Sequence, residues 1–165
     1  MNAVLRPART ADVQVVRRLV GQYTADGRLL AKAPVTLYED VQEFVVAEVD
    51  GDVVGCGALH VMWEDLGEIR TLAIDPAYTR QGIGGRILDQ LIERARTLGL
   101  ARLFCLTFET AFFEAHGFRE IDGSPVDHAV FEQLLQSYDE GVAEFLDLER
   151  VKPNTLGNSR MLMVL

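Results

Sequence analysis

The stretch from Glu68 to Thr97 constrains the fold of this chain more than any other part of its sequence. Apolar residues up to Ile74 predict a β-strand, a loop with several glycines follows, and residues 83–95 repeat apolar side chains with helical spacing. A glycine loop at the start of a helix presents backbone N–H groups to an anion. The stretch therefore predicts a strand–loop–helix unit that cradles phosphate groups. A tight strand-to-helix turn that binds nothing is the alternative.

The glycine loop, Gly82-Ile83-Gly84-Gly85, differs from two better-known phosphate loops. No Gly-Lys-Ser or Gly-Lys-Thr follows it, which excludes a nucleoside-triphosphate P-loop. The spacing of the glycines and the absence of a preceding strand–helix–strand unit disfavour a dinucleotide fingerprint. The ligand class therefore stays open on local evidence.

Composition limits the class of protein and its partners. With 165 residues, 48% hydrophobic and 25% charged, the chain fits one soluble domain over residues 1–165. Sixteen basic and 25 acidic residues give a net charge of −9, which argues against nucleic acid or an anionic membrane as partner. Without a membrane-spanning run or an apolar N-terminal segment, we expect a cytoplasmic protein. Cys56 and Cys105 lie in apolar runs and are expected to be buried free thiols, and no metal is expected.

The order of predicted elements indicates a mixed α/β or α+β sheet with helices on both faces. Thr10 is the expected N-cap of the first long helix and Thr36 that of a short second helix. Asp50-Gly51-Asp52 is expected to turn a hairpin, and Gly55 with Gly57 indicates a bulge or a close backbone approach. The predicted strands are 4–8, 44–49, 53–62, 68–74, 101–108, 118–121 and 161–165, and the predicted helices are 11–22, 36–42, 83–98, 110–115 and two pieces within 122–149.

Three segments of the chain resemble the GCN5-related N-acetyltransferases (GNAT). They are Leu72-Ala73-Ile74-Asp75-Pro76, Gly82-Ile83-Gly84 and residues 112–118, Phe-Phe-Glu-Ala-His-Gly-Phe. Within that family the chain is most similar to the short, single-domain N-acetylglutamate synthases of arginine biosynthesis, at residues 67–70, 106–110, 137–139 and 152–159. The resemblance extends from about Leu5 to the C-terminus. It implies a single-domain GNAT fold with a mixed, mostly antiparallel sheet of six to seven strands.

The resemblance implies acetyl-CoA as co-substrate. It places the pantetheine arm along the backbone of Leu72, Ala73 and Ile74. It places the pyrophosphate on the amides of Arg80, Gln81, Gly82, Ile83, Gly84 and Gly85. Thr79 stands where the family usually has Gln or Arg, so Arg80 is expected to supply the charge. Phe113 is placed beside the cofactor, where many members have a tyrosine that protonates the leaving sulfur.

Acetyl transfer to an amine needs a deprotonated amine, a stabilised oxyanion and a proton for the leaving thiolate. Glu68, a carboxylate at the start of an apolar strand, is the candidate base, and a pairing with Arg70 on the same strand face is the alternative. The resemblance places the N–H of Leu72 at the oxyanion and Thr107 as the proton donor. Water alone is the alternative donor, and packing is the alternative role of Thr107. Cys105 is a weaker candidate as nucleophile, because no base lies near it in sequence.

An acceptor with two carboxylates needs cationic or multi-donor anchors. The first candidates are Lys32, with Leu30 in the same loop, and Arg70. A second group precedes the last strand and consists of Asn158, Ser159 and Arg160. The leading hypothesis is synthesis of N-acetyl-L-glutamate from acetyl-CoA and L-glutamate, the first step of arginine biosynthesis. The alternatives are the same chemistry on glutamine or another small amine, and a non-catalytic acetyl-CoA sensor. A homodimer is an expectation from the family.

Overall fold

A seven-stranded mixed sheet is the framework of the residues described by the computed structural model, which are 2–24, 32–151 and 157–165. The strands lie in the order β1-β2-β3-β4-β5-β7-β6. β4 and β5 pair in parallel, whereas the pairs β1–β2, β2–β3, β5–β7 and β6–β7 are antiparallel. The predicted α+β sheet is therefore confirmed. The strands are β1 (Val4–Pro7), β2 (Phe44–Val49), β3 (Asp52–Trp63), β4 (Leu66–Ile74), β5 (Arg102–Thr107), β6 (Arg119–Ile121) and β7 (Ser159–Val164).

The helices fall between these strands much as the sequence predicts. In chain order they are α1 (Val13–Thr24), α2 (Pro34–Glu39), α3 (Ile83–Leu98), α4 (Thr110–Ala115), α5 (His128–Leu134) and α6 (Glu140–Phe145). Short 3-10 turns stand at Thr10–Asp12, Val41–Glu43, Pro76–Tyr78 and Glu149–Val151. In the part of the chain that the structure describes, no helix is long and apolar enough to cross a bilayer.

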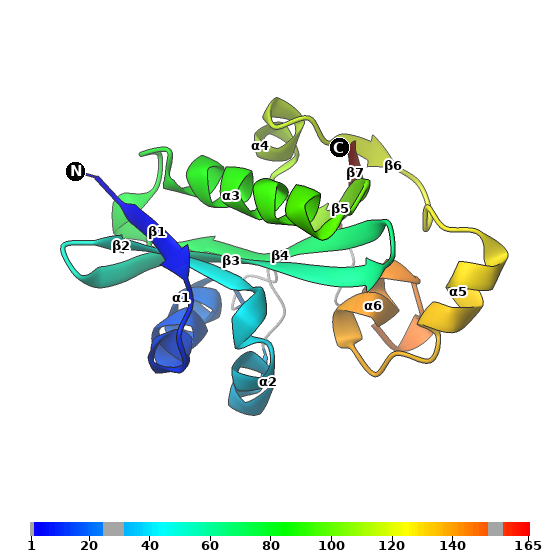
Figure 1. The fold of residues 1–165 in the computed structure, drawn as a ribbon, viewed down its shortest axis with the longest axis horizontal. Helices are drawn as coiled ribbons and strands as arrows, with labels where there is room; N and C mark the ends of the chain where they lie inside the picture. Colours follow the sequence, from blue (N-terminus) through cyan, green and yellow to red (C-terminus); the bar gives the residue numbers. More distant parts are fainter. Residues whose placement is uncertain (1, 25–31, 152–156) are drawn as a thin grey trace. The chain divides into compact units, whose positions relative to one another are not determined.

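The chain groups into two compact units. The first comprises Met1–His60 and Ile69–Leu98, and the second comprises Val61–Glu68 and Gly99–Leu165. In the first unit, α1 and α2 lie on one side of the strands and α3 lies on the other (Figure 1). The core under α1 and α2 is built from buried aliphatic and aromatic side chains, among them Val16, Leu19, Leu37, Phe44 and Val46.

Gly55 and Gly57 in β3 allow α3 to pack closely on the first unit's strands. A Cβ added at Gly57 would lie 2.8 Å from Cγ2 of Ile87, a buried side chain of α3. A Cβ added at Gly55 would lie 2.8 Å from Cδ1 of Ile74. The pairing of β2 with β3 also shifts register at this place, between Ala47 and Glu48. The prediction is a bulge or a close backbone approach. The register shift confirms the bulge, whereas the atoms that crowd the two glycine positions belong to side chains such as Ile74 and Ile87.

The second unit packs around the ring of Phe104 in β5. This ring meets Phe145 of α6 edge to face, with 4.8 Å between the ring centroids. Leu66, Leu134 and Leu162 are buried in the same cluster, which joins β4, α5 and β7 to it. α4 lies against β6 and β7. The acidic region 122–149 therefore forms two helical pieces, as predicted, and each supplies apolar side chains to a core.

Two helix starts differ from the prediction. Thr10 does not cap α1, because residues 10–12 form a 3-10 turn and the Asp12 carboxylate accepts the N–H of Arg9 at 2.7 Å. α2 starts at Pro34 rather than at Thr36 and ends at Glu39. Proline suits the first helical position, where no N–H partner is needed. Cys56 and Cys105 are buried and free, as predicted.

Candidate functional site

β4 changes its backbone conformation in the middle of the strand. Its pairing with β5 covers Leu66, Gly67 and Glu68. Thr71, three residues further on, has φ of 57°. A buried β-branched residue in this left-handed region is strained by about 1–3 kcal/mol. The Cys56 thiol donates to the Thr71 carbonyl at 3.4 Å. The irregularity therefore directly precedes Leu72, Ala73 and Ile74, the residues predicted to face the pantetheine arm.

The end of β4 is held by hydrogen bonds on both sides of one peptide group. The Tyr23 hydroxyl donates to the Ile74 carbonyl. The N–H of Asp75, which belongs to the same peptide group, donates to the Val54 carbonyl at 2.8 Å. The Asp75 carboxylate then accepts the N–H of Ala77 at 2.9 Å and starts the 3-10 turn Pro76–Tyr78. The strand therefore passes into the loop along a defined path.

The loop before α3 has the features of an anion site. Arg80 and Gly82 have φ of 61° and 81°, and a Cβ added at Gly82 would meet nothing within 4 Å. The backbone N–H of Arg86 donates to the Gly82 carbonyl at 3.1 Å, so residues 83–85 form the first turn of α3, and the N–H groups of this turn have no intrahelical partner. Arg80 is exposed beside them. These residues fit a diphosphate group, which binds to free amides at a helix N-terminus.

Thr79, which stands where the family usually has Gln or Arg, has a structural role in the loop. Its hydroxyl donates to the carbonyl of Pro76 at 3.1 Å, three residues earlier. Thr79 itself is exposed. The side chain therefore supports the loop backbone, and Arg80 remains the residue that brings a cation to this part of the loop.

The second unit contains a buried carboxylate whose charge acts on two other side chains. The carboxylate is Glu68, and the two side chains are Cys105 and Arg160. Glu68 is only 3% exposed and pairs in register with Phe104 of β5. Burial, and then the charge of Glu68, raise the pKa of the Cys105 thiol well above its ordinary value. Burial lowers the pKa of Arg160, whereas the charges of Asp147 and Glu68 raise it. Cys105 therefore stays protonated as a thiol, which agrees with the expectation that it is a weak candidate for the nucleophile.

Thr107 and Ser159 lie opposite each other where β5 pairs with β7. Thr107 is 8% exposed, and its hydroxyl oxygen accepts the N–H of Glu109 at 2.8 Å. A hydroxyl that accepts one bond still has its own hydrogen to donate. The neighbouring Asn158 has a buried Oδ1 that finds no hydrogen-bond partner in the described residues. The hydroxyl groups of Thr107 and Ser159 and the amide of Asn158 therefore lie at one end of the β5–β7 pair. Thr107 is a predicted catalytic residue, whereas Asn158 and Ser159 are predicted to bind the acceptor.

Arg160 is bound to backbone carbonyls of its own unit. Nε donates to Gly123 at 2.8 Å, Nη1 donates to Glu144 at 3.2 Å, and Nη2 donates to Phe145. Its guanidinium carbon lies 5.0 Å from the centroid of the Phe104 ring. Arg160 thus ties α6 and the loop at Gly123 to β7. Its predicted role in binding an acceptor stays a prediction.

The other predicted site residues are placed as follows. Lys32 is half-buried just before α2, and Arg70 is 9% exposed in β4. Leu30 lies outside the described residues. Phe113 is buried in α4, and its ring packs edge to face against Phe112 and Phe118, with centroids 5.2 Å and 5.1 Å away. Among the residues described, no group of three or more His, Cys, Asp or Glu side chains is arranged to hold a metal ion.

Two residues of this region are not found by the sequence prediction. Nothing in the sequence marks Thr71, because threonine is an ordinary strand residue whose left-handed conformation comes from tertiary structure. Tyr23 does carry a signal. It follows Val16, Leu19 and Val20 by seven, four and three positions, so it continues the apolar face of α1.

Comparison with known proteins identifies the family. The profile of the acetyltransferase (GNAT) family matches residues 16–118. An amino-acid acetyltransferase of Mycobacterium tuberculosis is 62% identical over 165 residues, which is 98% of this chain and 94% of the relative. An amino-acid acetyltransferase of Neisseria meningitidis is 35% identical over 117 residues, which is 70% of this chain and 27% of that longer relative.

Solved structures agree with this assignment. A crystal structure of a Mycobacterium tuberculosis protein in complex with CoA and NLQ is similar with a TM-score of 0.95 and 62% identity, covering 98% of this chain and 99% of that one. The N-acetylglutamate synthase from Neisseria gonorrhoeae, complexed with coenzyme A and N-acetyl-glutamate, has a TM-score of 0.78 and 25% identity, covering 100% of this chain and 35% of that one. The chain belongs to the acetyltransferase (GNAT) family.

Proposed function

We propose that this protein transfers the acetyl group of acetyl-CoA to the α-amino group of L-glutamate and so makes N-acetyl-L-glutamate, the first step of arginine biosynthesis. The observation that carries acetyl transfer to an amino acid is the 62% identity, over 98% of the chain, with an amino-acid acetyltransferase. The similarity to an N-acetylglutamate synthase complexed with N-acetyl-glutamate supports glutamate as the acceptor.

Acetyl-CoA supplies the acetyl group as a thioester. Leu72, Ala73 and Ile74 offer strand backbone to the pantetheine arm. The free amides of residues 83–85 and the cation of Arg80 receive the pyrophosphate, whose negative charge suits the N-terminus of α3. Gly82 leaves the approach open, because its position has no neighbouring atom within 4 Å of an added Cβ.

Glu68 acts as the general base. An α-ammonium group is mostly protonated at neutral pH, so the acceptor must lose a proton before its nitrogen attacks. The new C–N bond forms as the C–S bond breaks, with the developing oxyanion accepting from the N–H of Leu72. The proton that the ammonium group loses before attack goes to Glu68. The nitrogen loses a second proton as the amide forms, and this proton replaces the one that the Thr107 hydroxyl, or a water molecule, gives to the departing thiolate.

Asn158 favours a second acceptor, L-glutamine. Its Oδ1 is buried and lacks a hydrogen-bond donor among the described residues. A buried acceptor atom without a donor is unfavourable by about 1–3 kcal/mol, which a ligand N–H would relieve. The side-chain amide of glutamine brings such N–H groups, whereas the carboxylate of glutamate brings none. Transfer to glutamine by the same residues is therefore the second candidate.

The acceptor is tested by thiol release from acetyl-CoA with a panel of amino acids and small amines, followed by mass spectrometry of the product. We expect turnover with glutamate, glutamine or both. Turnover confined to other amines would overturn both acceptors. CoA binding without turnover on any amine would favour the acetyl-CoA sensor instead.

The base is tested by Glu68→Gln, which keeps the size of the side chain but removes its basicity. We expect kcat to fall by about 100-fold or more at neutral pH, the usual contribution of a general base. Glu64→Gln is the matched control, because Glu64 is exposed at the β3–β4 turn. Full activity of the Glu68→Gln enzyme would remove Glu68 as the base and leave the proposed reaction in place.

A further inference from the structure

We propose that Tyr23 is a positioning residue for acetyl-CoA: its hydroxyl fixes the peptide group through which β4 passes into the phosphate-binding loop. The inference rests on the proposed function, because it assigns acetyl-CoA to this loop. Tyr23 is assigned no part in the chemical step. It acts on the ligand through the backbone of Ile74 and Asp75.

The Tyr23 side chain reaches this peptide group from a well-packed position. It lies in the last turn of α1, on the face that buries Val16, Leu19 and Val20. Its ring packs against the core cluster that contains Ala73, the residue before Ile74. A tyrosine ring has few internal rotations, so packing its base also fixes its hydroxyl. The hydroxyl donates to the Ile74 carbonyl.

The peptide group between Ile74 and Asp75 is bonded at both of its polar atoms. Tyr23 binds the carbonyl oxygen, and the Val54 carbonyl binds the N–H at 2.8 Å. Because a peptide group is planar, two bonds on opposite sides determine the orientation of its plane. α1 holds one side and β3 holds the other. The direction in which the chain leaves β4 is therefore set by two elements of the first unit.

The phosphate loop starts from this peptide plane. Asp75 accepts the N–H of Ala77, the turn Pro76–Tyr78 follows, and Arg80 and Gly82 then take left-handed conformations. An arginine at φ of 61° is uncommon and persists only where its surroundings determine it. A shift at the start of the loop therefore reaches the amides of residues 83–85.

Removing the Tyr23 hydroxyl has a defined expected effect on ligand binding. The Ile74 carbonyl loses one partner, and the loop samples more conformations that acetyl-CoA must then order on binding. The net contribution of one such hydrogen bond corresponds to about a fivefold change in affinity. The groups of the chemical step, which are Glu68, the N–H of Leu72 and Thr107, lie outside residues 74–86. The change is therefore expected in KM for acetyl-CoA and not in kcat.

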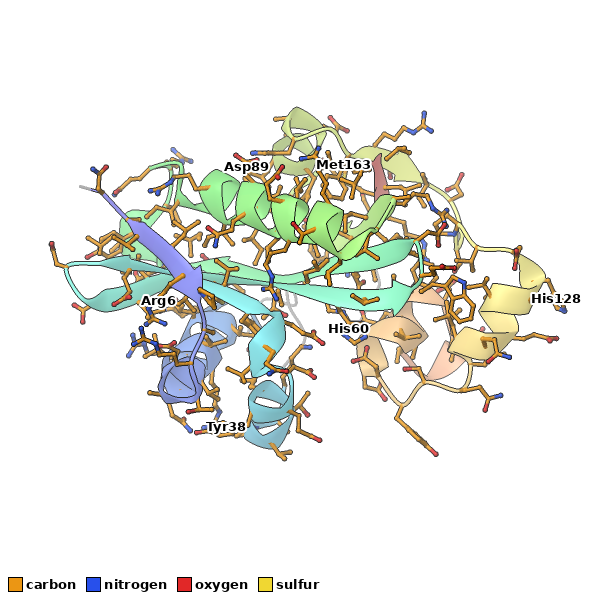
Figure 2. All side chains as sticks on the ribbon, in the orientation of Figure 1. Arg6, Tyr38, His60, Asp89, His128 and Met163 are labelled. Atoms are coloured by element: carbon orange, nitrogen blue, oxygen red, sulfur yellow. The ribbon has the colours of Figure 1, made fainter. Side chains whose placement is uncertain are left out.

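The test compares Tyr23→Phe with Tyr38→Phe. Tyr38 lies on α2 (Figure 2), is 42% exposed, and its hydroxyl accepts from Gln14 at 3.2 Å. Each variant loses one hydrogen-bonded hydroxyl, but only Tyr23 bonds to β4. For Tyr23→Phe we expect about fivefold weaker CoA binding by calorimetry, a similar rise in KM for acetyl-CoA, kcat within about twofold, and faster amide hydrogen exchange confined to residues 74–86. Tyr38→Phe is expected to match the wild type in all four measurements.

The outcomes separate this inference from the proposed function. Unchanged CoA affinity in Tyr23→Phe overturns the positioning role. Faster exchange throughout the first unit together with weaker binding also overturns it, because it indicates a general loss of stability. A wild-type protein that binds no CoA overturns the proposed function. The local exchange at residues 74–86 still reports in that case whether Tyr23 orders the loop.

Discussion

Among the single residues of this site, Glu68 is a buried carboxylate whose negative charge acts on the thiol of Cys105. Burial and the charge of Glu68 raise the pKa of Cys105 well above its ordinary value, and burial raises the pKa of Cys56 to about 12. The thiolate is the nucleophilic form of cysteine, and neither residue forms it readily near neutral pH. Direct transfer from the thioester to the amine therefore needs no acetylated cysteine.

This argument predicts the behaviour of Cys105→Ala. We expect its kcat to stay within about twofold of the wild type, because the thiol takes no part in the transfer. Its stability should fall by about 1 kcal/mol, since Cys105 is fully buried. Wild-type protein mixed with acetyl-CoA alone should show no acetyl adduct in its intact mass. An adduct on Cys105, lost in the variant together with activity, would establish a covalent route.

At the element scale, α3 approaches the first unit's strands closely because two strand positions have no side chain. A Cβ at Gly57 would lie 2.8 Å from Ile87 Cγ2 and 3.1 Å from Cδ1 of both Leu72 and Leu91. Ile87 and Leu91 are fully buried, so their ends have little room to move. We expect Gly57→Ala to lower the free energy of unfolding by about 1–3 kcal/mol through overpacking.

Gly21→Ala is the matched control for this prediction. Gly21 lies inside α1, and a Cβ added there would meet nothing within 4 Å. Alanine lowers the entropy of the unfolded chain and favours the helix, so we expect a gain of up to about 1 kcal/mol. Urea midpoints of the two variants should move in opposite directions. A gain in stability for Gly57→Ala would contradict the close approach of α3.

The elements differ in how well the sequence predicts them. α3 is predicted to its last residue, because its apolar stripe has helical spacing and Gly99, with φ of 87°, provides the stop. The hairpin turn at Asp50-Gly51 is predicted for the same local reason, and both residues have positive φ. The start of α2 is missed, because Pro34 competes with Thr36 for the first position. The left-handed conformations of Thr71 and Arg80 are not marked by any local pattern of the sequence.

The residues of the candidate site also differ in how well the sequence predicts them. The glycine loop and Glu68 stand out because each combines an unusual residue with a predicted element, whereas Thr107 is given only by the family resemblance. The Tyr23–Ile74 bond and the bonds of Arg160 to Gly123, Glu144 and Phe145 join residues that are far apart in the chain. Their backbone acceptors carry no sequence signal at all. These long-range bonds are therefore the part of the site for which the structure adds most to the sequence.

At the scale of the whole molecule, acid has two opposing effects on stability. The net charge of −9 at pH 7 gives a self-repulsion that weakens as carboxylates take up protons. Ion pairs that need a charged carboxylate weaken over the same range. The main example is Asp12, which accepts from Arg6 at 2.7 and 2.9 Å and from the N–H of Arg9 at 2.7 Å. Arg6 also donates to Glu48.

The Asp12→Asn variant tests the second effect, which is the weakening of ion pairs as carboxylates take up protons. The hydrogen bond from Arg6 lowers the pKa of Asp12 in the folded state below the value of about 3.9 that it has when unfolded. A carboxyl with a lowered folded pKa stabilises the fold above its unfolded pKa and loses this contribution as the pH falls through its folded pKa. We therefore expect the wild type to exceed Asp12→Asn by about 1–3 kcal/mol at pH 7. That difference should stay constant down to about pH 5 and shrink below about pH 4.

Asp89→Asn controls for the change in net charge, because Asp89 is exposed on α3 (Figure 2). Its effect on the free energy of unfolding should be within about 0.5 kcal/mol at each pH. Urea unfolding of the three proteins between pH 3 and pH 7 measures both differences, and self-repulsion cancels between the two variants because they carry the same net charge at neutral pH. A difference between wild type and Asp12→Asn that grows on acidification would reverse the sign of this linkage. Such a result would mean that a group other than the Arg6–Asp12 pair stabilises the first unit in acid.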